Sequence, residues 1–140
     1  MISRAALALL GVAPFTGCGS SADLSTELTI VATLMDGQGG PVGGARGQLC
    51  VVARYRAAYV GGEAFDNTSC VSMTPDTSGH VTTMIVLGPR LQSVESSYVL
   101  ISGDSCHYAG VVPPLQIRDE DSHRAASAEM TYVISSTTCA

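Results

Sequence analysis

Residues 27–35 read ELTIVATLM and residues 36–41 read DGQGGP. Every second residue from Leu28 to Leu34 points to one face of an extended chain and the residues between them point to the other, which is the period of a β-strand. The next segment combines glycines, which adopt positive φ without strain, with Pro41, which fixes a corner. A strand that ends in a tight turn is therefore predicted at the start of a β-rich domain.

Six further segments have the composition of short strands and are separated by turns rich in glycine and proline. They comprise residues 49–59, 69–73, 81–87, 98–102, 107–112 and 126–135. Residues 61–68 are expected to form a loop, and residues 75–79 a tight turn. Because no long helix is indicated, we expect an all-β fold, an antiparallel sandwich of about seven strands that is immunoglobulin-like or prealbumin-like.

Residues 36–45 read DGQGGPVGGA, and residues 76–81 read DTSGHV. These two segments resemble turns of carboxypeptidase regulatory-like and bacterial immunoglobulin-like modules. In those modules an Asp-rich turn joins the first two strands, and an Asp-x-x-Gly turn precedes a later strand. The resemblance spans roughly Leu28 to Leu87 and implies a sandwich fold, in modules that typically serve as spacers, adhesin parts or binding domains.

The N-terminal segment has the layout of an export signal. Arg4 is the only charged residue before Asp23, and an apolar run extends from Ala5 to Phe15. This run is shorter than the roughly twenty apolar residues that a membrane-spanning helix needs. We therefore expect a cleaved signal peptide over residues 1–17.

The run ends in Phe15-Thr16-Gly17-Cys18, which resembles the lipobox of bacterial lipoproteins. The resemblance implies lipidation of Cys18 and attachment to the membrane through acyl chains, of which two or three give stable anchoring. Gly19, where aspartate would signal retention at the inner membrane, implies an outer-membrane address in the bacterial cell envelope. The alternative is an ordinary cleaved signal that leaves Cys18 as a free or paired thiol.

The rest of the chain has the size of one domain. Residues 18–26 are expected to form the lipidated cysteine and a flexible tether, and residues 27–140 the β-sandwich domain. The formal net charge is −5, and all seven cationic residues are arginines that do not cluster in the sequence. This charge argues against nucleic acid as a partner and against electrostatic docking on anionic lipid.

Four cysteines remain once Cys18 is set aside, and an even number in an exported chain predicts two disulfides. Sequence alone leaves three pairings open. We favour Cys106 with Cys139, because they fall on opposite arms of the last predicted hairpin, and this choice leaves Cys50 with Cys70. No Cys-x-x-Cys spacing indicates a zinc or redox site.

Three groups of residues are minor candidates for a functional site. Asp119, Asp121 and His123 could offer ligands to a metal, although a solvated hairpin loop explains the same charges. The loop at residues 61–68 could insert into the active site of an enzyme and inhibit it. A shared tyrosine surface could stack on sugars, and it would involve Tyr55, Tyr59, Tyr98, Tyr108 and Tyr132.

The sequence contains no recognised catalytic motif, so we expect a protein that is not an enzyme and needs no cofactor or metal. The leading hypothesis is a lipid-anchored module that binds or structurally contacts another envelope component, either a protein or a glycan. A small extracytoplasmic enzyme inhibitor is the alternative, followed by a metal-binding or carbohydrate-binding protein.

Overall fold

The computed structural model describes residues 24–139, and the expected signal peptide and Cys18 lie outside this range. The described chain contains eight strands and no helix. The strands are β1 (Thr26–Asp36), β2 (Gly47–Tyr55), β3 (Phe65–Met73), β4 (His80–Leu87), β5 (Leu91–Ile101), β6 (Tyr108–Gly110), β7 (Arg118–Asp119) and β8 (Arg124–Ile134). The expected all-β class is confirmed.

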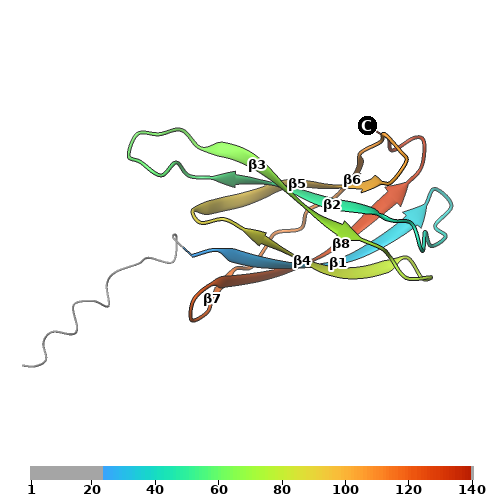
Figure 1. Ribbon diagram of the computed structural model, residues 1–140, viewed down its shortest axis with the longest axis horizontal. Coiled ribbons are helices and arrows are strands. Elements are labelled where there is room, and N and C mark those ends of the chain that lie inside the picture. Colours follow the sequence, from blue (N-terminus) through green and yellow to red (C-terminus); the bar gives the residue numbers. More distant parts are fainter. Residues whose placement is uncertain (1–23, 140) are drawn as a thin grey trace, which may run out of the picture.

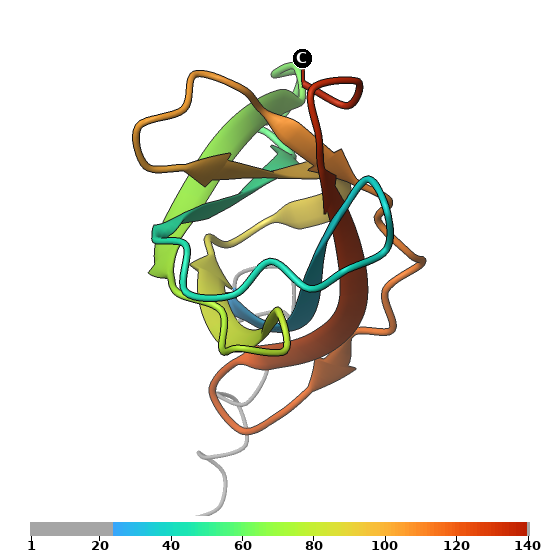
Figure 2. The same cartoon turned by 90° about the vertical axis from the view of Figure 1, so that its right-hand side faces the viewer.

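The strands form one hydrogen-bonded sheet in the order β3-β2-β5-β6-β8-β1-β4, with β7 added on β8. The sheet folds over on itself, so that β3, β2 and β5 face β8, β1 and β4 across a single core (Figures 1 and 2). Neighbouring strands are antiparallel except β1 and β8, which run parallel along the whole of β1. This parallel pair was not predicted, because pairing between the two ends of the domain leaves no local signal in the sequence.

Alternation along the strands builds the core, as the first strand shows. Leu28, Ile30, Ala32 and Leu34 are fully buried, as the period of two predicts. They pack with side chains from both layers: Leu49, Val51, Ala53, Tyr55, Met73, Ile85, Leu87, Leu91, Val99, Ala126, Ala128, Met130 and Tyr132. This cluster is the single hydrophobic core that a domain of this size supports.

Several strand boundaries differ from the prediction. β2 ends at Tyr55 and not at residue 59, and β3 begins at Phe65 inside the expected loop. β5 begins at Leu91, well before the expected start at Tyr98. The start of β3 was missed because its first half lies at a sheet edge with exposed side chains. The start of β5 was missed because irregular pairing with β2 breaks the alternation of buried and exposed residues along β5.

The two ends of the sandwich carry different loops. We call the end where β1 begins the tether end, and it also carries the loop at residues 56–64, the turn at 88–90 and the turn at 120–123. The opposite, distal end carries residues 37–46, 74–79 and 102–107 and the C-terminal segment 135–139 (Figure 2). Residues 24–139 contain no helix that is long and apolar enough to cross a membrane.

Candidate functional site

A hollow of the described surface lies at the distal end, where β2 begins and β3 and β5 end. It has a volume of about 610 Å³. We call it the distal pocket, and its lining consists of Arg46, Gly47, Gln48, Ser72, Met73, Thr74, Leu100, Ile101, Ser102, Gly103 and Asp104. Most of these side chains are polar, so the hollow offers several hydrogen-bond donors and acceptors.

The register of three strands brings the lining together. Gln48 lies directly opposite Ser72 on β3 and Leu100 on β5, so that one amide is flanked by a hydroxyl and an apolar side chain. At Gly47, a Cβ atom would lie 2.1 Å from the carbonyl oxygen of Leu100. Only glycine permits this close approach of β5, which shapes the floor of the pocket.

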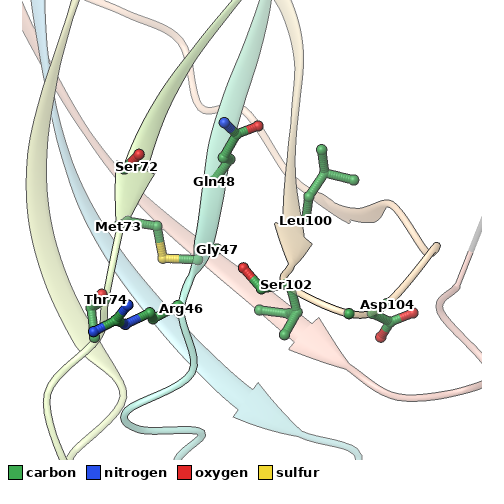
Figure 3. Close-up of a pocket in the computed structure, with 11 residues that line it drawn as sticks. Arg46, Gly47, Gln48, Ser72, Met73, Thr74, Leu100, Ser102 and Asp104 are labelled. Atoms are coloured by element: carbon green, nitrogen blue, oxygen red, sulfur yellow. The ribbon is translucent and has the colours of Figure 1, made fainter.

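Arg46 supplies the positive charge of the pocket. Its side chain is exposed, and it forms no ion pair with any residue between 24 and 139. Figure 3 shows Arg46 beside Thr74 at one side of the pocket and Asp104 at the other. A guanidinium that is not committed to a carboxylate, with hydroxyl groups nearby, suits a ligand that carries an anionic group.

Asp104 is held in place by its own loop. Its carboxylate accepts hydrogen bonds from the backbone N–H of Cys106, at 3.0 Å, and from the hydroxyl of Tyr108. These bonds, first that from Tyr108, hold the pKa of Asp104 below its usual value. The same contact raises the pKa of Tyr108, because the neutral phenol is the donor. Asp104 therefore fixes the rim of the pocket and does not neutralise Arg46.

The outer face of the same layer continues from the pocket toward two cross-strand features. Cys50 and Cys70, directly opposite on β2 and β3, form a disulfide with a Cα–Cα distance of 4.1 Å. On the other side of Cys50 lies Tyr98, whose ring stacks on His107 with centroids 4.6 Å apart. The disulfide and the ring pair leave Cys50 fully buried although it lies outside the core cluster.

The disulfide pairing that we favoured is present. Cys106 and Cys139 form the second bond, with a Cα–Cα distance of 4.9 Å, and it joins the loop at residues 102–107 to the C-terminal segment. Both disulfides lie toward the distal end and brace the surroundings of the pocket. Cys18, the expected lipidation site, lies outside the described residues.

The expected cluster of Asp119, Asp121 and His123 does not assemble as a metal site. His123 instead lies between two glutamates, 3.4 Å from Glu27 and 3.2 Å from Glu120. Over residues 24–139 no set of three or more histidine, cysteine, aspartate or glutamate side chains is arranged to hold a metal ion. Asp119 pairs with Arg124 and Glu120 with Arg118, as in a solvated hairpin.

The prediction that the five tyrosines share one surface is also wrong. Tyr55 is 5% exposed and stacks on Phe65, whereas Tyr59 is 73% exposed and lies beyond the end of β2. Tyr108 and Tyr132 are buried, and only Tyr98 lies on the outer face. The five rings therefore serve different parts of the fold.

The inhibitory loop proposed for residues 61–68 is shorter than expected, because residues 65–68 belong to β3. The distal pocket, in contrast, was missed. Its residues come from three strands, and only their register brings Arg46, Gln48 and Ser102 together. The one local signal was the exposed arginine next to a glycine at the entrance of β2.

No protein family and no curated protein match the sequence. One solved structure with partial likeness is 3-chlorocatechol 1,2-dioxygenase from Rhodococcus opacus 1CP, at a TM-score of 0.38 and 10% sequence identity. The likeness covers 76% of this chain and 59% of the dioxygenase chain. At this distance it carries no argument about activity.

Proposed function

We propose that this protein is a lipid-anchored, non-catalytic binding module of the bacterial cell envelope. Acyl chains on Cys18 hold it at the outer membrane, and the distal pocket contacts an envelope component that presents an anionic group. The observation that carries the proposal is that the start of β1 and the distal pocket lie at opposite ends of the sandwich. β1 begins at Thr26 on the tether end, whereas the pocket lies where β2 begins at Gly47, on the distal end.

The short distance between anchor and domain supports this orientation. The segment from Cys18 to Leu24 spans at most about 20 Å when fully extended. A lipidated Cys18 therefore keeps the tether end close to the headgroups, and the distal end points away from them. The pocket is then available to a component that lies beyond the membrane surface.

The anchor is tested by following labelled fatty acid in cells that produce the wild-type chain or Cys18→Ser. We expect label on the wild type only, and we expect the Cys18→Ser protein to leave the membrane fraction. Label on both proteins, or on neither, would contradict lipidation at this cysteine.

The binding role is tested by site-specific photo-crosslinking in intact cells. A photoreactive amino acid replaces Gln48 in the pocket or, as the control, Glu129, which is exposed on the outer face of β8. We expect one discrete product from position 48, none from position 129, and loss of the product when Arg46→Ala is added. No product at position 48, or equal products at both positions, would overturn the assignment.

A further inference from the structure

The sheet ends in two strands that each lack a neighbour on one side. The strand order begins with β3 and finishes with β4, and within residues 24–139 β3 pairs with no strand but β2, and β4 with no strand but β1. We call the unpaired sides the free edges. Both lie on the same side of the sandwich, at the left of Figure 2. β3 runs toward the distal end and β4 runs back, so the two free edges are antiparallel but belong to different layers.

The hydrogen-bond pattern identifies the backbone groups of β4 that point to its free edge. The N–H of Leu34 donates to the carbonyl of Gly79 at 2.7 Å, so the pair in this register position bonds across the ladder. In an antiparallel pair such bonding recurs at every second residue. The odd-numbered residues of β4 therefore bond to β1, and the even-numbered ones direct N–H and C=O away from it. The groups that remain available along the free edge are those of Thr82, Met84 and Val86.

The same reasoning applies to β3. Cys50 and Cys70 lie directly opposite with a Cα–Cα distance of 4.1 Å, the short spacing of a pair that exchanges no ladder bonds. The even-numbered residues of β3 therefore direct their backbone groups away from β2 and toward the free edge. They are Asp66, Thr68, Cys70 and Ser72.

Neither free edge carries the features that keep exposed strands apart. Proteins protect such edges with lysine, proline or a β-bulge. β3 and β4 contain no lysine and no proline, and they pair with β2 and β1 without a shift of register. Met84 and Val86 are also 48% and 57% exposed. Edges of this kind are templates for a further strand.

The charges along the two edges are compatible with each other. β4 contains no aspartate, glutamate or arginine. β3 contains one charged side chain, Asp66, whose carboxylate accepts a hydrogen bond from Nε of Arg54 at 3.0 Å within the same chain. On β1, Glu27 lies opposite Val86 and 3.4 Å from the ring of His123. If β3 of one molecule meets β4 of another, no like charges lie directly opposite, an arrangement that would oppose pairing.

We infer that the occupant of the free edges is a second copy of the chain, and that β3 of each copy pairs antiparallel with β4 of the other. A two-fold axis parallel to the strands, beside the open side of the sandwich, brings β3 against β4 in both layers at once. One register matches the free backbone groups of both edges, and its central pair is Thr68 with Met84. Each layer then continues from one copy into the next, and every free edge is paired.

Pairing of β3 with β3, or of β4 with β4, is less suitable. Either arrangement leaves the other edge without a neighbour. Either also reverses one copy, so that the two tether ends point in opposite directions. The pairing of β3 with β4 keeps both tether ends on the same side of the dimer. It therefore agrees with the proposed anchors at Cys18, although it does not depend on them.

Cysteine cross-linking in the cell envelope tests the pairing. Two differently tagged chains are produced together, one carrying Thr68→Cys and the other Met84→Cys, and a short thiol-specific cross-linker is added. We expect a product that contains both tags. We expect none when either variant is produced alone, or when Glu129→Cys, at an exposed position of β8, replaces Met84→Cys. A product from Met84→Cys alone, a product from Thr68→Cys alone, or the absence of the mixed product would overturn the inference.

The oligomeric state gives an independent measure. Sedimentation equilibrium should give the mass of a dimer for the wild type in detergent and also for Cys18→Ser, so a failure of the anchor would leave this inference standing. Met84→Pro removes an N–H that points to the free edge, and it should raise the dissociation constant at least about tenfold. Met84→Ala keeps that N–H and should remain a dimer. Circular dichroism checks that Met84→Pro is folded, and the cross-linking does not use this variant. A monomeric wild type, or equal dissociation of Met84→Ala and Met84→Pro, would contradict pairing through the backbone of β4.

Discussion

The two ends of the sandwich hold their loops in different ways. At the distal end each of three loops is organised by an aspartate that accepts backbone hydrogen bonds. Asp36 accepts from Gln38 and Gly40, Asp76 from Ser78 and His80, and Asp104 from Cys106, at 2.8 to 3.0 Å. A carboxylate that satisfies two backbone donors fixes the turn around it.

The distal loops are also tied to one another. The N–H of Gly44 donates to the carbonyl of Pro75 at 2.9 Å, which joins the loop at residues 37–46 to the β3–β4 turn. A Cβ atom at Gly43 would lie 2.3 Å from the carbonyl oxygen of Asp76, so these two loops are in close contact. The disulfide Cys106–Cys139 adds a covalent link. The surroundings of the distal pocket are therefore fixed before any ligand binds.

In the part of the chain that the structure describes, the loops of the tether end are joined by backbone hydrogen bonds but by no disulfide. The N–H of Arg56 donates to the carbonyl of Arg90 at 2.9 Å, and the β7–β8 turn combines a backbone hydrogen bond from Glu120 to His123 with ion pairs around His123. Such pairs contribute little in water. The distal end is therefore the more firmly fixed of the two, because it adds a disulfide and aspartate-centred turns to its backbone hydrogen bonds.

Removal of the disulfide between Cys106 and Cys139 should have the largest effect on this contrast. For a bridge with a sequence separation of 33, the chain-entropy account predicts that Cys106→Ala with Cys139→Ala lowers the free energy of unfolding by about 3.5 kcal/mol. Denaturant unfolding measures the loss. Hydrogen exchange should then show protection falling first around residues 102–107 and 135–139.

The tether end serves as the internal control of that experiment. Exchange in residues 56–64 should be the same in the wild type and in the double variant. A free energy of unfolding that does not change, or a uniform loss of protection in both ends, would contradict a distal end that is braced by this bond.

Features that depend on residues close in the sequence were predicted correctly, whereas most features that depend on distant residues were not. The turn at Gly79 was predicted from Asp-x-x-Gly alone and is present, with a φ of +79° at Gly79. The core positions of β1 followed from the period of two in the same way. These features depend on neighbours in the sequence, so the sequence contains their signal.

Features that depend on strand register were not predictable in this way. The parallel pairing of β1 with β8 joins segments about a hundred residues apart, and neither carries a mark of the other's direction. The distal pocket and the pair of Arg56 and Arg90 arise from the same kind of long-range placement. The disulfides are the exception, because a predicted hairpin brought Cys106 and Cys139 together before the fold was known.

Gly79 at the distal end and Gly61 at the tether end both have positive φ, so the same substitution compares the packing of the two ends. At Gly79 a Cβ atom would lie 2.4 Å from the carbonyl oxygen of Leu34, whereas at Gly61 nothing lies within 4 Å of it. Gly61→Ala should cost only the backbone strain of about 1 kcal/mol, and Gly79→Ala about 3 kcal/mol because a steric clash is added. Thermal unfolding of both variants tests whether Gly79→Ala loses more stability than Gly61→Ala. Equal losses would show that the tether-end turn is as closely packed as the distal one.

The distal aspartates predict a dependence of stability on pH. Backbone hydrogen bonds, first that from His80, lower the pKa of Asp76, and the hydroxyl of Tyr108 lowers that of Asp104. A lowered pKa in the folded state gives stability that is present above the unfolded value near 3.8 and is lost as the pH falls through the folded value. The raised pKa of Tyr108 gives stability below about pH 10 that is lost at higher pH.

Melting temperature as a function of pH tests this assignment. We expect Asp76→Asn with Asp104→Asn to flatten the acid limb of the profile. Asp121→Asn, at an exposed position of the β7–β8 turn, is the control at the tether end and should leave the acid limb as in the wild type. An acid limb that persists in the double variant would mean that carboxylates elsewhere cause it.

The smallest effect is expected at Val60. Because this side chain contacts no other residue, Val60→Ser should change the free energy of unfolding by no more than about 0.5 kcal/mol. The same substitution at Val51, which is fully buried in the core, should cost on the order of 3 kcal/mol, because it leaves a cavity and a buried hydroxyl. Denaturant unfolding of both variants measures the difference. A loss at Val60 close to that at Val51 would show that the valine stabilises the loop. A negligible loss would show that Val60 has no role in the stability of the fold.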